Sequence, residues 1–526
     1  MRTAARHMGC SSGAEHFCRG ADEMRKNDAA LVAAGAFLCA LGMWCDAGCG
    51  GDIERETHGS KTERLEDLHA LTTIAVPEPA GTEIVDTDAA IVLGKAFFWD
   101  QQAGSDGITA CASCHATAGA DSRRFNIVNP GPNGVFEACG TNGPSQSTTP
   151  CNGISDDRIG SQGVAASSFV SIASDTTSAV DVCTPLTTGT YGSARQVTAR
   201  NAPSIVGAAL YRDAFWDGRA RHTLHGVDPM ACGGRPVDGP NSLAEKLLAR
   251  QPLQLQRVSV RDSVLGGLSA APNRGLNTTY RDLLIKAFGN AASGNAVMTK
   301  FSTFWGQSIL AYESTLIPNQ TPFDAYLSGN KSALTANQQR GLDRFMGRAG
   351  CAKCHAGSEL SDATVSFAAA RGVVNDDGGD QGFHNVGVRP SEEDVGRAGT
   401  GPNRGAFKTP QLRNVKLTAP YFHNGGKATL RSVVELYAAG GDFANAEKSR
   451  HVKRLRLEPR DVDALVDFLT NGLTDCRTEK ERAPFDHPSL AFPDGPTLAA
   501  VGADGTGSCP RGPQTPLDRS RSLTMR

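Results

Sequence analysis

Two copies of one five-residue pattern constrain this 526-residue chain more than any other feature. Residues 111–115 read CASCH and residues 351–355 read CAKCH, so each copy has two cysteines spaced by two residues and then a histidine. In such a CxxCH motif the thiols add to the vinyl groups of a haem, and the histidine becomes the proximal ligand of the iron. The sequence therefore predicts two covalently bound c-type haems. The predicted attachment residues are Cys111, Cys114 and His115 in the first copy and Cys351, Cys354 and His355 in the second.

Zinc and a redox-active dithiol are the alternative interpretations of these cysteine pairs. A zinc ribbon can combine two CxxC pairs, but its pairs normally lie far closer in sequence than these do. Chance would supply roughly 0.01 CxxCH matches in a chain of this composition, so two matches by accident are not expected. Haem attachment is the favoured interpretation.

An apolar segment with helical spacing precedes each motif, DAAIVLGKAFFWD at 88–100 and LTANQQRGLDRFM at 334–346. Thr335 and Gln338 form a capping box at the start of the second segment. Further helical periodicity is present at 242–254, 279–288, 300–316 and 458–473. Both motif-preceding segments share a glycine and aromatic residues, namely Gly94, Phe97 and Phe98 in the first and Gly341 and Phe345 in the second. The pattern predicts a mainly α fold with two duplicated, cytochrome c-like haem domains and long irregular loop insertions.

The chain is too long for one growing core, so several segments are expected. We predict a leader at 1–50, a linker at 51–85, an N-terminal haem domain at 86–325 and a C-terminal haem domain at 326–480. A loop insertion at about 121–195, rich in Gly, Ser, Thr, Asn and Pro, interrupts the first domain. The tail, 481–526, turns to Pro and Gly and is expected to fray.

The leader has the features of an export signal. Arg25 and Lys26 follow Met24, a candidate start residue, and an apolar run at 29–44 comes next, which is short for a transmembrane span. A buried N-terminal helix is the alternative. Cys49 is a candidate lipid anchor, although Asp46 is a poor residue at that distance. The expected location is the periplasm.

Cysteine usage agrees with an oxidising compartment. Outside the leader and the two motifs six cysteines remain, which are Cys139, Cys151, Cys183, Cys232, Cys476 and Cys509. An even remainder in an exported chain favours disulfides, with Cys139–Cys151 and Cys476–Cys509 as local pairs. The net charge of −2 gives no reason to expect nucleic acid or an anionic membrane as a partner.

Four segments together resemble the bacterial di-haem cytochrome c peroxidases and their MauG-like relatives. They are LGKAFFWD…ACASCH, ARNAPSIVGAALYRDAFWDGRA, LTANQQRGLDRFMGRAGCAKCH and GAFKTPQLRNVKLTAPYFHNGGKATLRSVVELY. The resemblance covers most of residues 86–475. It implies two α-helical haem domains with a calcium ion and a tryptophan between the haems. It also implies reduction of hydrogen peroxide at the N-terminal haem, with electrons from a small c-type cytochrome or cupredoxin entering through the C-terminal haem.

By position in these motifs, Trp216 matches the tryptophan that couples the haems; a packing residue at a domain interface is the alternative. Asn201, Thr418 and Pro420 match the calcium positions, where oxygen ligands suit a hard cation. Arg219 either faces a haem propionate or forms a surface salt bridge.

The distal ligand of the C-terminal haem distinguishes two branches of the family. The peroxidases carry a methionine twelve residues after a motif glycine, and Tyr437 stands at that distance from Gly425. This tyrosine is what the MauG-like branch carries, and no methionine lies near it. A phenolate stabilises ferric iron, whereas a thioether does the reverse. The alternative is a core tyrosine that leaves the iron to another group such as His384.

The N-terminal haem lacks several family features. No histidine lies between His115 and Arg200, so the loop ligand that caps this iron in the better-known peroxidases is missing. His222 and His225 are possible substitutes. Where the family has a glutamine this chain has Gly226, and the expected Glu-Met pair reads Pro229-Met230. Asp228 or His225 could then handle the protons needed for O–O cleavage.

The resulting expectation is a di-haem peroxidase-like enzyme with Trp216, His225 and Asp228 as catalytic residues. A non-catalytic two-haem electron carrier and a MauG-like oxidase of a partner protein remain the alternatives.

Overall fold

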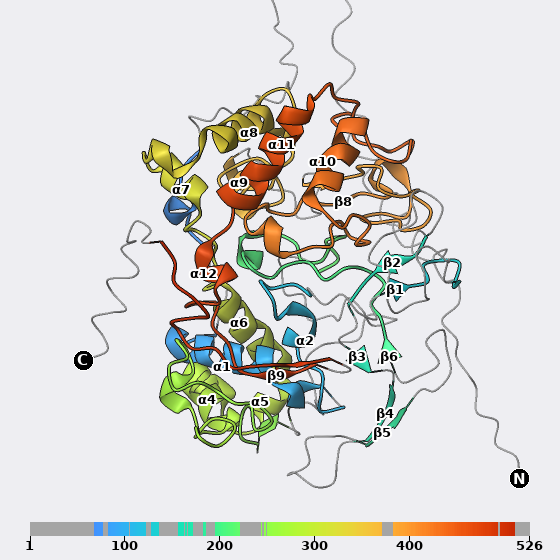
Figure 1. Ribbon diagram of the computed structural model, residues 1–526. Coiled ribbons are helices and arrows are strands. Elements are labelled where there is room, and N and C mark those ends of the chain that lie inside the picture. Colours follow the sequence, from blue (N-terminus) through green and yellow to red (C-terminus); the bar gives the residue numbers. More distant parts are fainter. Residues whose placement is uncertain are drawn as a thin grey trace, which may run out of the picture. The chain divides into compact units, whose positions relative to one another are not determined.

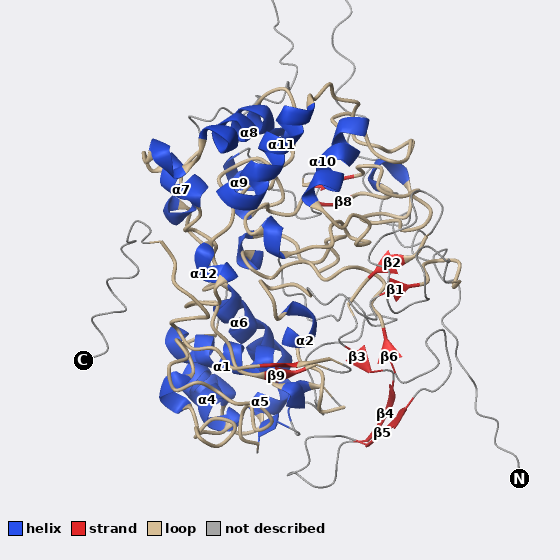
Figure 2. Cartoon of the chain, in the orientation of Figure 1, coloured by secondary structure: helices blue, strands red, loops and turns tan. Residues whose placement is uncertain are grey.

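The computed structural model describes residues 68–510 (Figure 1). The gaps in this range are 77–82, 105, 122–127, 136–155, 162–163, 166, 172–181, 186–194, 221–243, 245–246, 249, 371–381 and 493–494. All described residues belong to one compact unit of the chain, Thr62–Pro229 together with Pro236–Arg526. The described part is mainly helical with a few two-stranded ladders, as predicted (Figure 2). None of its helices is long and apolar enough to span a membrane.

The helices around the first motif form the N-terminal module. They are α1 (Thr87–Trp99), α2 (Ala112–His115), α4 (Tyr280–Phe288), α5 (Ala296–Thr299) and α6 (Phe301–Glu313). Asp86 caps α1 by accepting a hydrogen bond from the Ala89 amide. In the core the Phe97 ring stacks on Tyr280 with centroids 4.8 Å apart, and Phe301 packs edge-on against Phe97. This confirms the helices predicted at 88–100, 279–288 and 300–316.

The C-terminal module has a second core. Its helices are α7 (Pro322–Leu327), α8 (Ala336–Met346), α9 (Val365–Ala370), α10 (Leu430–Ala439), α11 (Pro459–Asp467), a π turn (Phe468–Gly472) and α12 (Cys476–Glu479). The Thr335–Gln338 capping box is present at the start of α8. Leu342 and Phe345 of α8 join Leu465 and Phe468 in this core.

One helix crossing is repeated in the two modules. A Cβ added at Gly94 of α1 would overlap the backbone carbonyl of Ser308 in α6, and one at Gly341 of α8 would overlap the carbonyl of Ala464 in α11. Each helix that precedes a CxxCH motif therefore crosses a later helix at a glycine. This supports the predicted duplication with a common packing geometry.

Short ladders and 3₁₀ turns make up the remaining regular structure of the described residues, and loops connect them. The paired strands are β1 (Val128–Asn129) with β2 (Arg158–Ile159), β3 (Val164–Ala165) with β6 (Arg195–Gln196), β4 (Ser167–Ser171) with β5 (Val182–Pro185), β7 (Phe383–His384) with β8 (Phe407–Lys408), and β9 (Leu490–Ala491) with β10 (Thr497–Leu498). The 3₁₀ turns are Leu71–Thr73, Gln101–Ala103, Ala208–Leu210, Gly266–Leu268, Gly289–Ala292, Lys331–Ala333, Cys351–Lys353, Gly401–Asn403 and Val415–Leu417. Within 242–254, the described Ala244, Leu247 and Leu248 are helical and buried.

The segment predicted as a linker contains residues that pack on the C-terminal module. Leu68 belongs to the second core, the His69 amide donates to Ser358 Oγ at 3.0 Å, and the Leu71 amide donates to Asp324 Oδ1 at 2.9 Å. The predicted boundary after residue 325 falls inside α7, whose Phe323 is buried in the same core. The second module thus includes residues on both sides of the first.

The prediction that the tail frays is wrong for its described part. Phe485 and Leu490 lie in the first core, and Gln101 Nε2, just after α1, donates to the Ala491 carbonyl of β9 at 2.7 Å. Asp486 accepts hydrogen bonds from the amide and hydroxyl of Ser263 at 2.6 Å and lies 3.6 Å from Lys95 Nζ of α1. The Cys476–Cys509 disulfide is confirmed. Buried polar contacts, which tail composition does not reveal, hold this segment.

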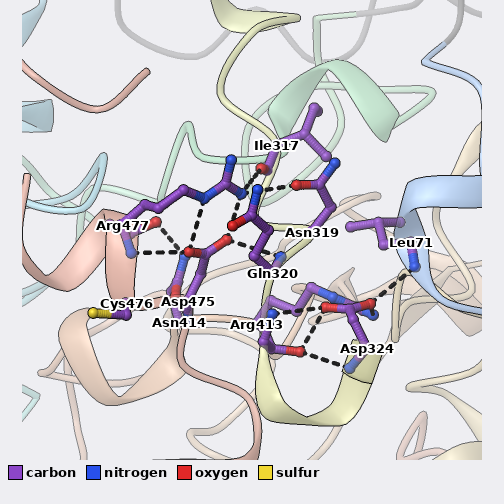
Figure 3. A network of polar contacts seen from close by, with 12 residues as sticks. Leu71, Ile317, Asn319, Gln320, Asp324, Arg413, Asn414, Asp475, Cys476 and Arg477 are labelled. Carbon is purple, nitrogen blue, oxygen red and sulfur yellow. Dashed lines mark hydrogen bonds and ion pairs between the residues drawn. The ribbon is translucent and has the colours of Figure 1, made fainter. Parts of the chain in front are cut away.

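A buried polar network joins the two modules where the chain passes between them (Figure 3). Arg413 pairs with Asp324 at 2.7 Å, and the Gln320 amide donates to Asp475 Oδ2 at 3.0 Å. Arg477 pairs with Asp475 at 2.6 Å and also donates to the Ile317 carbonyl at 3.2 Å. These contacts fix the connection between α6 and α7 against α12.

Candidate haem sites

The first CxxCH motif lies at the edge of the N-terminal core. Cys111 caps the short α2, and His115 ends it, with Nδ1 2.9 Å from the carbonyl oxygen of Gly119. Burial lowers the pKa of His115, so the ring is neutral and its Nδ1–H can donate to that carbonyl. The Nε2 lone pair is then left for a metal, which is how metal-ligating histidines are usually oriented.

The second motif repeats this arrangement. His355 Nδ1 lies 3.2 Å from the Leu360 carbonyl oxygen, and burial lowers its pKa as well. In each module the aromatic residue predicted from the pattern flanks the histidine, since Phe98 lies 6.5 Å from His115 and Phe345 lies 6.5 Å from His355 between ring centroids. The two histidines therefore have equivalent surroundings.

The four motif cysteines do not form a shared metal site. Cys111 packs against the first core and Cys351 against the second. Among the described residues, the group that brings three potential ligand atoms within 4.8 Å of one another is Cys354, Asp362 and His384. Two separate CxxCH sites fit two haems and do not fit a zinc ribbon built from both pairs.

Tyr437 lies in the second haem site. Burial and the neighbouring thiols Cys354 and Cys351 raise the pKa of this α10 phenol. The side chain is only half-buried, and its hydroxyl has no hydrogen-bond partner among the described residues. A phenol in this position fits an iron ligand, because a ferric ion would supply the positive charge that its ionised form lacks here.

His384, the alternative ligand, is already engaged. Its Nε2 lies 2.7 Å from Asp362 Oδ2, and contacts with Asp362 and Cys354 raise its pKa to about 10 against the effect of burial. The ring nitrogen that faces Asp362 is therefore not available to an iron, whereas Cys354 would carry no charge once it is bonded to a haem. This arrangement favours Tyr437.

The N-terminal site contains an acid that sequence reasoning missed. Burial raises the pKa of Glu313, the last residue of α6, to about 7. Burial and then the charge of Glu313 raise the pKa of the Cys111 thiol. Nearby, Trp99 Nε1 donates to Tyr312 Oη at 3.2 Å, and the Trp99 ring stacks on His487 with centroids 4.8 Å apart. No sequence spacing links Glu313 to Cys111; only the packing of α6 does.

Trp216 makes a hydrogen bond to each module. Its Nε1 donates to the Asn201 carbonyl at 2.9 Å, and its own carbonyl accepts from the Lys408 amide of β8 at 2.7 Å. The side chain is half-buried. This position is compatible with the predicted role between the haems and also with the packing alternative.

Comparison with known proteins assigns the N-terminal part of the chain to a family. Residues 88–332 match the family model described as di-haem cytochrome c peroxidase. Residues 88–332 belong to the di-haem cytochrome c peroxidase family. The resemblance drawn from the motifs is thereby confirmed.

Three curated relatives agree with this assignment. The cytochrome-c peroxidase IdrP1 of Denitromonas iodatirespirans is 26% identical over 414 residues, which cover 75% of this chain and 84% of the relative. IdrP1 of Pseudomonas sp. (strain SCT) is 29% identical over 287 residues, covering 51% and 67%. The methylamine utilization protein MauG of Methylorubrum extorquens is 28% identical over 276 residues, and the match spans 63% of its length. A solved MauG-like protein associated with microbial copper homeostasis aligns with 21% identity and a TM-score of 0.47, covering 78% of this chain and 97% of that one.

The calcium positions of the family come together in part. Asn201 is buried, and its Nδ2 lies 2.6 Å from the Pro420 carbonyl oxygen, while Thr418 Oγ1 donates to the Val415 carbonyl at 3.2 Å. Rotating the Asn201 amide by half a turn would set two oxygens face to face, an arrangement that a cation stabilises. Asn201 and Pro420 fit a calcium site, which stays a prediction.

Other family positions have different outcomes. Arg219 pairs with Asp217 at 2.9 Å and lies over the Phe215 ring, so the surface salt bridge is the observed arrangement. His225 and Asp228, predicted to handle protons, lie outside the described residues, as does His222. The same holds for the leader with Cys49 and for the Cys139–Cys151 pair.

Proposed function

We propose that this chain is a periplasmic di-haem oxidoreductase of the MauG-related branch, which reduces hydrogen peroxide at the N-terminal haem with electrons that enter through the C-terminal haem. The observation that carries the proposal is the difference between two otherwise equivalent haem sites. The C-terminal site has Tyr437 as a candidate distal ligand, whereas the N-terminal site has a buried acid near its first cysteine.

The bound haems would supply the redox chemistry, and the chain supplies the groups that hold and tune them. His115 and His355 would present Nε2 to the irons because their Nδ1 atoms are engaged by carbonyls. Tyr437 would favour the ferric state of the C-terminal haem. Reduction of one peroxide to two waters takes two electrons and two protons, so both haems and a proton-holding group are needed.

Trp216 is the candidate connection between the modules. Its hydrogen bonds to Asn201 and Lys408 fix the indole and its backbone where the N-terminal and C-terminal segments meet. Glu313 can exchange a proton near neutral pH, since burial raises its pKa to about 7. It joins His225 and Asp228 as a candidate for proton handling.

Oxidation of a partner protein is the second candidate function. Tyr437 at the C-terminal site favours it, because this position distinguishes the MauG-like branch, and relatives named MauG match the chain. A small c-type cytochrome or cupredoxin is the proposed electron donor for peroxide turnover.

Electron paramagnetic resonance and absorption spectra of the purified ferric protein test the proposal. A high-spin signal from the N-terminal haem that disappears after one equivalent of hydrogen peroxide is the expected result. Two low-spin haems that do not respond to peroxide, even after partial reduction, would identify an electron carrier instead. His115→Gly should remove the peroxide response and leave the C-terminal haem spectrum in place.

The proposed periplasmic location has separate support. The apolar run at 29–44 follows basic residues, and the Cys476–Cys509 disulfide requires an oxidising environment. Cell fractionation and N-terminal sequencing of the mature protein test it, and recovery of an unprocessed cytoplasmic protein would refute it. Lipid attachment at Cys49 would appear as an added mass on the mature N-terminus.

A further inference from the structure

A run of basic side chains lies on the C-terminal module. Residues 448–456 read KSRHVKRLR, with five Lys or Arg and no acid, in a chain whose net charge is −2. Arg450, Lys453, Arg454 and Arg456 are exposed. Positive charge is therefore concentrated at one place on this module.

This run borders the second haem site on two sides. The Ser449 amide donates to the carbonyl of Asn385, the neighbour of His384, at 2.8 Å. The Leu455 amide donates to the carbonyl of Ala438, the neighbour of Tyr437, at 2.8 Å. The segment thus extends from the His384 side of the site to the Tyr437 side.

Two further cations extend the run. Lys353 stands between the two haem cysteines of the second motif and is exposed, as is Arg348 just before the motif. Burial and then the charges of Lys353 and Arg450 lower the pKa of His451, so both the motif and the run contribute positive charge beside this ring. We name this set the basic rim: Arg348, Lys353, Arg450, Lys453, Arg454 and Arg456.

The charge of the basic rim is not neutralised by described neighbours. None of its six members forms an ion pair with an acid in the part of the chain that the structure describes. Other cations of this module do so, since Arg340 and Arg344 pair with Asp461, and Lys427 pairs with Asp442. Uncompensated charge around a cofactor site attracts partners of the opposite sign and increases their association rate.

We propose that the basic rim is the docking surface for the electron donor and that the donor is a small redox protein with an acidic face around its own redox centre. The inference rests on the proposed entry of electrons at the C-terminal haem. Cys351, Cys354 and His355 would hold the haem that takes one electron from the reduced donor, and no proton or covalent bond would be transferred. A donor bound to the basic rim would lie beside Lys353 and therefore next to the second CxxCH motif.

Stopped-flow reduction of the ferric holoprotein tests this without peroxide. The probes are a reduced acidic c-type cytochrome and a reduced basic one. The acidic probe should reduce the C-terminal haem about 10-fold more slowly when salt is raised from low to physiological ionic strength, and the basic probe should not slow down. Lys453→Glu with Arg454→Glu should slow the acidic probe about 10-fold at low salt.

A matched control keeps the same change in charge but moves it to the other module. Arg281→Glu with Lys286→Glu alters two exposed residues of α4 and should leave the acidic probe's rate within about twofold. Equal effects of the two double variants, or rates independent of salt, would overturn the proposal.

Two further outcomes distinguish donor docking from lipid binding and from the proposed peroxidase function. If the rim variant loses binding to vesicles of phosphatidylcholine and phosphatidylserine while the donor rate is unchanged, the rim is a lipid surface and the docking proposal is wrong. Failure of the ferric protein to react with peroxide, with donor docking as expected, would refute the proposed peroxidase function and leave the docking surface in place.

Discussion

At the scale of single residues, the phenol of Tyr437 distinguishes the two haem sites. Tyr437→Phe removes the oxygen and keeps the ring, so the ferric spectrum of the C-terminal haem should change while that of the N-terminal haem does not. Low-temperature electron paramagnetic resonance measures both signals. Tyr326→Phe is the control, because this α7 tyrosine packs on the C-terminal core and lies under Lys331. An unchanged C-terminal signal in Tyr437→Phe would contradict ligation by this residue.

Glu313 predicts a pH dependence of stability. Its pKa is about 7 in the folded protein and about 4.5 in an unfolded chain, so the native state holds the proton more tightly. The corresponding stability is fully present below pH 4.5 and is lost as the pH rises through 7. In Glu313→Gln the side chain is neutral at every pH. The Tm of the variant minus the Tm of the native protein should therefore be larger at pH 8 than at pH 5. Equal Tm differences at both pH values would show that the carboxyl is not buried in this way.

Individual site residues differ in how far the sequence predicts them. The six haem-attachment residues are recognised because their chemistry requires one short, local spacing. Glu313 and Asp362 were missed because their partners, Cys111 and His384, are brought to them only by packing. The choice between Tyr437 and His384 became possible once the structure showed which of them is already hydrogen-bonded.

At the scale of elements, the two helix crossings at glycines predict that Gly→Ala changes have very different effects on the free energy of unfolding at different positions. Gly94→Ala and Gly341→Ala insert a methyl group against a backbone carbonyl, which costs about 3 kcal/mol or more because two helices must separate. Gly306, in the middle of α6, has nothing within 4 Å of an added Cβ, so Gly306→Ala should stabilise the protein by about 0.5–1 kcal/mol. Denaturant unfolding of the three variants measures the difference.

The helices were largely predictable and the packed irregular segments were not. The period of apolar residues and a local capping box specify α1 and α8 from nearby residues alone. Residues 68–74 lie in the segment predicted as a linker and residues 481–492 in the predicted tail, and only their partners in distant parts of the chain show that they are ordered. Leu68 and Phe485 each fill a core built by the other end of the sequence.

At the scale of the whole molecule, the two segments have a crosswise arrangement, in which each completes the core of the module at the other end of the chain. Residues 68–74 complete the C-terminal core, and residues 481–492 complete the N-terminal core. Loss of one late contact should therefore destabilise the first module. Asp486→Ala removes the acceptor of both Ser263 hydrogen bonds, while Lys95 keeps its ion pair with Asp262 at 2.8 Å, and should cost about 1–3 kcal/mol. Thermal unfolding followed at each haem is the measurement, and both haem signals should shift together because the network around Asp324 and Asp475 couples the modules.

The control lies in the same tail. Asp504→Ala breaks an exposed pair with Arg261 and should change stability by less than about 1 kcal/mol. If Asp486→Ala shifted only the N-terminal haem signal, the modules would unfold independently and the polar network would not couple them.

The crosswise arrangement also sets an order of events during synthesis. The N-terminal end emerges first both in synthesis and in the proposed export, so residues 86–320 are present before residues 481–498, and the module that emerges first is completed last. Until Phe485, Asp486 and Leu490 have emerged, the CASCH motif is part of an unfinished core whose cysteines are open to the haem-attachment machinery. The second motif waits only for α10, α11 and the turn that ends at residue 472, because residues 68–74 are already present when these helices form. The length of chain still to be made thus gives the first haem site a longer period of access than the second.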